Sequence, residues 1–489
     1  MFTSIFCHRR FHIVYIIMFG ILTSFVSSSL GFGQVPGKGD TLEISQVFIK
    51  NDTLGSRTLD TTGLEFNNNE EEINKKPVSG ISDGNVPSFW ASNVFGPMRL
   101  GLKYELAYKF TKPDEIKKNR FSFRLEYSKF FFDHFSLQVD TKISTYLKDD
   151  HRTRNSTFWI NDNTEKADMS FGGKTKEAYL QASFHKTSIK AGIQTLVWGE
   201  SDFAAVTDEI SPMDYREPLN LNLDELRMGQ LMLSFDQYTP FGDLSGFFIP
   251  DPKFNEYPKK GTGYYNDPFN GSVEYQMEKQ DKNLFEYGIR WKKTFGKSDI
   301  SLMAASLINN DYASCLTNPS LITQCKQRYS MAGMTFNYAI NNFLVKGEVA
   351  MKSPKTFNDE SFQIVKKNAL DASLGVDYSA SSTLTLSMEA VNYHVINWKD
   401  KLQGVPRDNY MLLLIMSKQF LNNDLSLNWV TMYNGPYSNF FNLLTTSYNW
   451  NDHFTLYFDV LLPVTKNINS GLWIYRDQKQ VAFKIQYQF

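Results

Sequence analysis

The chain has 489 residues, with 51 basic and 52 acidic side chains and a formal net charge of −1 at pH 7. This balance provides no basic surface of the kind that indicates a nucleic-acid partner. Aromatic residues make up 15% of the chain, yet hydrophobic residues reach only 42% and the mean hydropathy is negative. A bundle of membrane-spanning helices is therefore excluded.

The first 33 residues have the layout of a secretory signal peptide. Arg9 and Arg10 precede an apolar run at residues 13–26, and small residues follow it. The run is short for a hydrocarbon core of ~30 Å, which argues against a transmembrane anchor. Residues 34–95 are polar and without periodicity, which predicts a flexible periplasmic leader.

From about residue 96 the sequence alternates between apolar and polar positions. In residues 100–110, the apolar face carries Leu and Tyr side chains and the other face carries Lys, Glu, Gly and Ala. The same alternation recurs at residues 121–128, 135–144 and 285–292. Charged residues at successive positions of one face would be costly in a dry core, whereas a water-filled lumen accepts them. The alternation therefore predicts strands with one face toward lipid and one toward a wet lumen.

Short connections alternate with long polar stretches along this region. Eight tight turns are predicted, at residues 130–134, 185–187, 239–243, 295–299, 341–342, 379–382, 421–424 and 449–453. The long stretches between them include residues 148–174, 198–228, 250–283, 308–327, 352–368 and 393–408. Short periplasmic turns and long external loops are typical of outer-membrane barrels. The sequence thus predicts an all-β, transmembrane antiparallel β-barrel of about 18 strands (range roughly 14–18) over residues 96–489.

The last expected strand, residues 473–489, ends the chain on an aromatic residue. Val481, Phe483 and Ile485 continue the alternation to Tyr487 and Phe489. This ending resembles the terminal strand that the barrel-assembly machinery recognises, so Tyr487 and Phe489 are the predicted assembly signal.

Two cysteines, Cys315 and Cys325, fall in one polar stretch, while Cys7 would leave with the signal peptide. After export the pair meets oxidising conditions and can close a loop disulfide. No His or second Cys pair accompanies them at metal-ligand spacing, and phosphate-binding glycine loops are absent from the sequence. We expect neither a metal nor a cofactor.

One segment differs from the strand-and-turn background: GIQTLVWGESDFAAVTDEISPMDYREP, followed by DELR and by a strand ending in GFFIP. Over residues 190–250 the chain resembles a large, uncharacterised family of outer-membrane barrels, distantly similar to alginate-export porins. The resemblance implies a wide barrel that transports lipids, steroids or other hydrophobic compounds. It also implies an inner-membrane efflux pump of the resistance-nodulation-division type, or a periplasmic carrier, as partner.

This segment carries more acids than a surface loop requires, and we expect it to fold inward as a constriction that selects solutes. Its acids would face Arg216, Arg227, or wall bases such as Arg124 and Arg290. The candidate selectivity residues are Trp198, Glu200, Asp202, Asp208, Asp214, Arg216 and Arg227. The alternative is that Trp198 packs at the barrel rim while the acids pair locally.

Catalytic readings have little support in the sequence. A lipase-like pair could be built from Ser387 or Ser373 with His394, and a protease-like fragment from Asp149, Asp150 and His151. Spacing alone supports the first, since His394 is expected at a strand end beside Tyr393, and a solvated loop explains the second. We therefore expect no enzyme.

The favoured function is a channel or conduit for a small hydrophobic or amphiphilic molecule, embedded in outer-membrane lipids. A general porin for ions or sugars and a structural or adhesive surface barrel are the alternatives. A hydrophobic conduit predicts apolar lumen patches or a lateral opening beside a strand-disrupting proline, for which Pro250 and Pro463 are candidates. A porin predicts a continuous polar bore.

Overall fold

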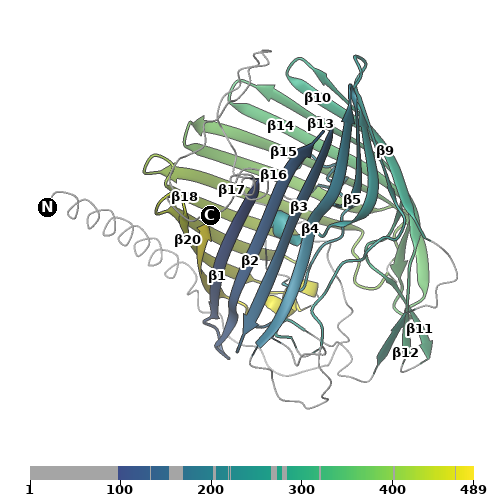
Figure 1. Ribbon diagram of the computed structural model, residues 1–489. Coiled ribbons are helices and arrows are strands. Elements are labelled where there is room, and N and C mark those ends of the chain that lie inside the picture. The colour runs from purple at the N-terminus through teal and green to yellow at the C-terminus, as the bar shows by residue number, and fades with distance from the viewer. Residues whose placement is uncertain are drawn as a thin grey trace. The chain divides into compact units, whose positions relative to one another are not determined.

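The computed structural model describes residues 97–132, 134–153, 169–201, 205–217, 220, 222–260, 262–265, 273–277, 284–318, 321–399, 402–468 and 470–489. The predicted signal peptide and leader lie outside the described residues. The remainder forms a ring of long strands around a lumen (Figure 1).

Eighteen strands form the ring. In chain order they are β1 Met98–Lys109, β2 Glu115–Phe131, β3 Phe135–Leu147, β4 Met169–Phe184, β5 Thr187–Gln194, β6 Gln230–Gln237, β7 Asp243–Ile249, β9 Glu286–Phe295, β10 Ser298–Ile308, β13 Arg328–Ile340, β14 Phe343–Asn358, β15 Ile364–Ser381, β16 Leu384–Val395, β17 Asp408–Phe420, β18 Leu425–Gly435, β19 Asn439–Asn449, β20 Phe454–Val464 and β21 Gln480–Gln488.

Five smaller elements of the described chain lie in the long loops. A separate three-stranded sheet consists of β8 Glu274–Met277, β11 Ala313–Asn318 and β12 Leu321–Cys325. The helical elements are the single turn α3 Leu223–Leu226 and the 3-10 helix η2 Gly471–Tyr475. Within the described part of the chain, no helix has the length and apolar character needed to span a bilayer.

Each strand of the ring pairs antiparallel with its neighbour along the chain, and the last strand pairs with the first. Gly101 lies opposite Gln488 and Lys109 opposite Gln480, so β1 and β21 close the barrel. The backbone of Phe489 donates a hydrogen bond to Leu100 at 2.9 Å and continues this ladder. The predicted 18-stranded antiparallel barrel is confirmed.

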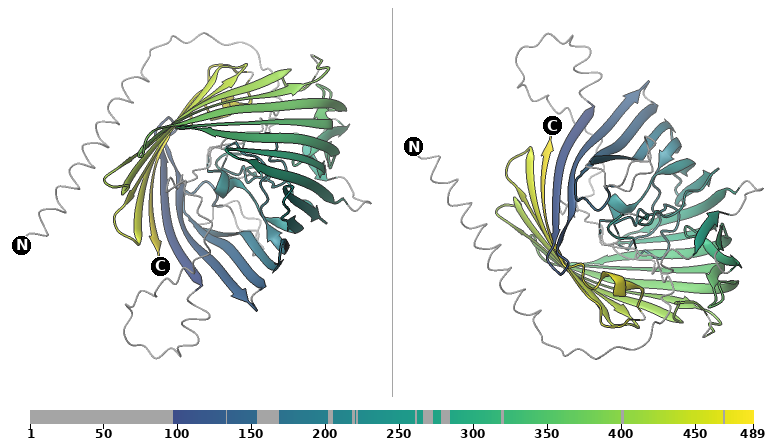
Figure 2. Two further views of the ribbon diagram at one scale, coloured as in Figure 1. Left: turned by 90° about the horizontal axis from the view of Figure 1, so that it is seen from above. Right: turned by 90° about the horizontal axis from the view of Figure 1, so that it is seen from below.

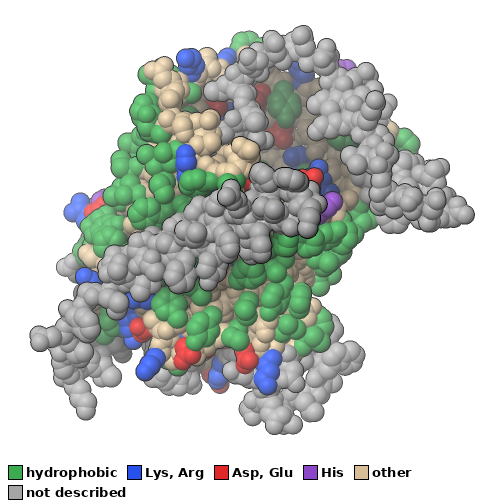
Figure 3. Space-filling view, turned by 90° about the vertical axis from the view of Figure 1, so that its left-hand side faces the viewer, with side chains coloured by type: hydrophobic (Ala, Val, Ile, Leu, Met, Phe, Trp, Pro, Cys, Tyr) green, Lys and Arg blue, Asp and Glu red, His purple; other side chains and the backbone are tan. Residues whose placement is uncertain are grey.

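The predicted faces are also confirmed. On β1, Leu102 and Leu106 are exposed outside the wall, whereas Glu105 and Lys109 are buried inside it. Figure 3 shows hydrophobic side chains spread over the outer wall, with Lys, Arg, Asp and Glu gathered at its lower edge. Apolar side chains exposed in this way are stable against lipid rather than water.

The eight predicted tight turns all join neighbouring strands. Two strand boundaries differ from expectation. Residues 352–368 were expected to be a loop, but β14 and β15 extend into this stretch and pair there as far as Asn358 and Ile364. The last strand begins at Gln480 rather than residue 473, because the preceding residues turn inward as η2.

The two candidate strand-breaking prolines have different positions. Pro250 directly follows the end of β7. A proline has no backbone N–H to donate to a neighbouring strand, so it is well tolerated just past a strand end. Pro463 lies inside β20 and pairs with Phe441, so it neither begins a loop nor interrupts the wall.

We expect an outward position to lose more stability than an inward position of the same strand when a charge is introduced. Leu414, at the middle of β17, is exposed on the outer face, and Ser417 of the same strand lines the lumen. Leu414→Arg should lower the unfolding free energy in lipid vesicles by about 2–4 kcal/mol, because arginine is costly at the bilayer midplane. Ser417→Arg is the matched control and should cost less than half as much. Equal losses in urea titrations would contradict the assigned faces.

Candidate functional site

The loop between β5 and β6, residues 195–229, folds into the lumen and is here called the inward loop. Figure 2 shows its teal segments inside the ring of strands. Trp198, Val206 and Ile210 are completely buried against the inner wall, and the Trp198 ring meets Phe247 of β7 edge-on at 5.2 Å between centroids. Burial of this apolar group attaches the loop to the wall.

A carboxylate of the wall holds the first turn of the inward loop. Glu348 of β14 accepts hydrogen bonds from the backbone of Glu200 and Ser201, both at 2.6 Å. Its second oxygen accepts from the backbone and hydroxyl of Thr207, at 3.1 and 2.8 Å. The Ser201 hydroxyl also donates to Glu389 of β16. Such charge-assisted bonds to otherwise unpaired amides are strong.

A buried ion cluster forms the second attachment to the same side of the barrel. Lys352 of β14 is fully buried and binds Asp371 of β15 at 2.6 Å as well as Glu209 of the inward loop. Glu209 also accepts a hydrogen bond from Tyr329 at 2.9 Å. The cost of burying charge is offset only because each partner is paired.

The third attachment lies on the opposite wall. Glu217 of the inward loop binds Arg120 of β2 and, at 2.8 Å, Lys118 of the same strand. Arg120 is fixed in turn by Asp150 at 2.8 Å. Strands β2 and β14 stand half-way round the ring from one another, so the inward loop crosses the lumen from wall to wall.

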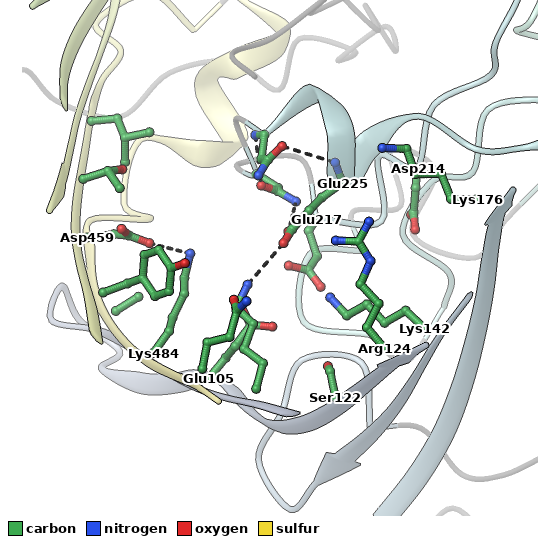
Figure 4. Close-up of a pocket in the computed structure, with 18 of the residues that line it drawn as sticks. Glu105, Ser122, Arg124, Lys142, Lys176, Asp214, Glu217, Glu225, Asp459 and Lys484 are labelled. Carbon is green, nitrogen blue, oxygen red and sulfur yellow. Dashed lines mark hydrogen bonds and ion pairs between the residues drawn. The ribbon is translucent and has the colours of Figure 1, made fainter. Parts of the chain in front are cut away.

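The crossing leaves a cavity of about 840 Å³ beside the inward loop. Its walls come from β1–β4 and from β13–β21, and Figure 4 shows charged side chains from opposite sides reaching into it. Twelve basic and nine acidic described residues line it, together with several aliphatic ones.

The predicted selectivity residues divide into two groups. Glu200, Asp214 and Arg216 line the cavity. Trp198 is buried against the wall, and Asp208 binds Arg227 at 2.8 Å in a buried pair that does not line the cavity. Asp202 lies outside the described residues. The expected inward folding is thus present in the structure, and the selective role of these residues stays a prediction.

Asp214 and Asp208 pair with two of the expected bases, Arg216 and Arg227, at 2.7 and 2.8 Å. The expected wall bases have other contacts. Arg124 binds Asp140, at 2.6 and 2.8 Å, instead of a loop acid. The guanidinium of Arg290 lies 6.0 Å from the Trp198 ring. Glu200 instead binds Lys292 at 3.0 Å. Lysines 142 and 174, which line the cavity, were also missed, because alternation identifies a lumen face without showing which lumen residues meet.

The two cysteines lie on neighbouring strands of the separate three-stranded sheet, but they are not directly opposite one another in the register. Cys315 of β11 pairs with Thr323, and Cys325 of β12 pairs with Ala313, so the cysteines are diagonal neighbours and are not bonded to each other. Diagonal positions are about 7–8 Å apart, which exceeds the usual reach of a disulfide. The disulfide stays a prediction that requires the hairpin to shift.

The residues considered for catalysis have ordinary contacts. His394 binds Asp408 at 2.7 Å beside an external loop, while Ser387 lines the lumen cavity. His151 contacts Arg120 at 3.2 Å, within the ion cluster that holds Glu217. The structure brings no serine of this set next to either histidine.

A closed 18-stranded barrel with an apolar exterior and a charged interior is a transmembrane barrel of the outer-membrane type. This fold places the protein in the Gram-negative outer membrane. The model of the family described as "Protein of unknown function (DUF1302)" matches residues 105–460, and the chain belongs to this family.

Solved porins share the fold. OccAB1 of Acinetobacter baumannii is 9% identical with a TM-score of 0.50, covering 80% of this chain and 96% of its own. OccK8 (OprE) of Pseudomonas aeruginosa is 9% identical with a TM-score of 0.48, covering 80% and 98%. OmpF of Salmonella typhi, solved with daunomycin, is 10% identical with a TM-score of 0.41, covering 80% and 97%. No protein of curated function matches the chain in sequence.

Removal of the Glu348 carboxylate should release the inward loop. Glu348→Ala leaves three loop amides without their acceptor, and we expect the attachment to weaken by about 2–5 kcal/mol. Amide hydrogen exchange in residues 200–207 should accelerate and single-channel conductance should rise. Glu126→Ala is the control, because this lumen carboxylate binds Arg124 at 3.1 Å and no other described residue. Unchanged exchange in Glu348→Ala would contradict the attachment.

The attachment of Glu217 to Arg120, on the opposite wall, should persist in mildly acidic solution. Burial acts to raise the pKa of Glu217, but Arg120, Lys118 and other bases outweigh it and hold that pKa well below 4.5. The stabilisation is therefore fully present above pH 4.5 and is lost only as the pH falls through the lowered folded-state pKa. Conductance should stay constant from pH 7 to about pH 4.5. In Arg120→Gln the acid transition should move to higher pH, whereas Arg99→Gln should leave it in place.

Proposed function

We propose that this protein is an outer-membrane channel for small solutes and that its cargo is a small hydrophobic or amphiphilic molecule. The observation that carries the proposal is the cavity of about 840 Å³ between the inward loop and a wall that is partly charged and partly aliphatic. This volume falls within the range of small-molecule sites. A purely structural or adhesive barrel would not require such a site.

The aliphatic part of the wall favours a hydrophobic or amphiphilic cargo over a general porin. Ile415, Val430 and Leu461 line the cavity, where Ile415 is partly buried and the other two pack into the apolar core on this side of the barrel. A bore that passes only ions or sugars has no use for an apolar patch at the edge of its cavity. The many charged residues around the cavity are the argument for the porin alternative, which the measurement below distinguishes.

The inward loop supplies the selection in this proposal. Glu200, Asp214 and Arg216 provide charges at the cavity, and the buried Trp198, Asp208 and Arg227 hold the loop in shape. A periplasmic carrier or an efflux pump of the inner membrane would deliver or receive the cargo, a partnership supported only by the family resemblance. Assembly through Tyr487 and Phe489 rests on the terminal aromatic strand.

Reconstitution in planar bilayers tests the proposal. Ion-conducting openings that sterols, fatty acids or other amphiphiles block, and that small sugars do not, are the expected result. Equal passage of sugars and amphiphiles would favour a general porin. A folded barrel that neither conducts nor binds any solute would overturn the channel.

Neutralising the acid at the first turn of the inward loop should change ion preference. Glu200→Gln removes the nearer carboxylate of Lys292, at 3.0 Å, and leaves this lumen cation with only the more distant Asp299, at 3.7 Å. The ratio of anion to cation permeability, read from the reversal potential in a salt gradient, should rise about twofold. Glu274→Gln, in the external sheet strand β8, is the control. An unchanged ratio in Glu200→Gln would remove this residue from the selectivity filter.

A further inference from the structure

Three cations form one row across neighbouring strands of the lumen wall. Arg124 of β2 lies directly opposite Lys142 of β3, and Lys142 lies directly opposite Lys174 of β4. All three line the cavity, and we call them the cationic row. Like charges placed directly opposite one another destabilise a sheet, so the fold alone gives no reason for this arrangement.

The outer two members of the cationic row have direct polar partners and the central one does not. Arg124 binds both oxygens of Asp140, while Lys174 lies 3.9 Å from Asp214 and donates to backbone carbonyls of the inward loop. Lys142 makes no hydrogen bond or ion pair with the described residues, and Glu105 and Glu225 interact with its charge only from beyond ion-pair distance. The ammonium group at the middle of the row is therefore open to a direct partner.

A second row, of aliphatic residues, runs across β17 to β20. Ile415 faces Val430, Val430 faces Leu443, and Leu443 faces Leu461. All four line the same cavity as the cationic row, and we call them the aliphatic row. The four form a continuous apolar strip in which Val430 and Leu461 are buried, while Ile415 and Leu443 are only partly buried and contact water in the cavity.

Only β21 and β1 separate the two rows along the wall. Between them, Lys484 of β21 pairs with Asp459 at 2.7 Å and Lys103 of β1 pairs with Glu225 at 3.2 Å. Figure 4 shows Arg124 and Lys142 reaching into the cavity from one wall and Lys484 with Asp459 from the other. The cavity thus offers a lysine without a direct ion-pair partner and an apolar strip within a single space.

We infer that the cargo is an anionic amphiphile, an organic acid whose charged group binds at Lys142 and whose hydrocarbon part lies along the aliphatic row. This inference rests on the proposed channel function and specifies its substrate class. An anion at Lys142 relieves the like-charge repulsion of the cationic row, and a hydrocarbon chain covers the partly exposed members of the aliphatic row, Ile415 and Leu443. Neither a neutral sterol nor a small inorganic anion satisfies both rows.

The probe that tests this inference is 1-octanesulfonate, which stays ionised at all working pH values. Ethanesulfonate has the same charged group without the chain, and octyltrimethylammonium has the chain with the opposite charge. Dissociation constants come from block of the single-channel current by each compound. We expect 1-octanesulfonate to bind at least about tenfold more tightly than either of the others.

Two matched variants distinguish direct binding of the anion at Lys142 from a general effect of positive charge in the lumen. Lys142→Gln should weaken 1-octanesulfonate block about tenfold. Lys346→Gln removes the same charge from the cavity, but from a lysine paired with Asp377 at 3.0 Å, and should change block less than about twofold. Equal losses in the two variants would overturn the assignment of the anion to Lys142.

The aliphatic row has its own pair of variants. Leu443→Asn should weaken 1-octanesulfonate about fivefold and leave ethanesulfonate unaltered. Leu344→Asn changes a leucine that lines the cavity outside the row and should affect neither compound by more than about twofold. A conducting channel without preference for 1-octanesulfonate overturns this inference and leaves the channel in place. Failure to conduct at all overturns the channel itself.

Discussion

Pairing of the first strand with the last is the constraint on which the rest of this structure depends. An open sheet edge in lipid would leave backbone N–H and C=O groups without partners, at a cost of several kcal/mol for each group. The ladder from Gly101–Gln488 to Lys109–Gln480 removes that edge. Once the ring is closed, each alternating position is committed to lipid or to lumen, so closure turns a local pattern of side chains into two chemically distinct surfaces.

The closed ring would enclose an open bore if the inward loop did not cross it. Two kinds of interaction hold the crossing. Trp198 is buried against apolar wall residues, and ion clusters at Lys352 and Arg120 fasten the loop to opposite walls. Buried ion pairs add little net stability compared with apolar contacts, but a charge without its partner is strongly unfavourable. The clusters therefore specify one position of the loop rather than simply adding stability.

The chemistry of the cavity comes from strands that are far apart in the chain. Lys142 of β3 and Leu443 of β19 share one space because β21 and β1 join the two ends of the sequence. Around this space the wall changes from cationic to paired ions to aliphatic. Such a graded wall suits a solute that is itself polar at one end and apolar at the other, and it distinguishes this lumen from a uniformly polar bore.

The sequence by itself determined the barrel, its strand number, the lipid and lumen faces and the eight tight turns. These follow from alternation, which is local, because successive side chains of a strand point to opposite faces. It also indicated that the segment beginning at Trp198 is unusual. Tertiary structure alone decided that Trp198, Asp208 and Arg227 are buried supports while Glu200 and Asp214 meet the cavity.

The rows and their contacts were likewise decided by tertiary structure. Which residue of β3 faces Arg124, or which residue of β12 faces Cys315, depends on the register between strands. Register is set by inter-strand hydrogen bonds, by turns and by closure of the whole ring. The alternation within a single strand is the same for every register that differs by two residues, so the sequence of one strand carries no record of its neighbours across the wall.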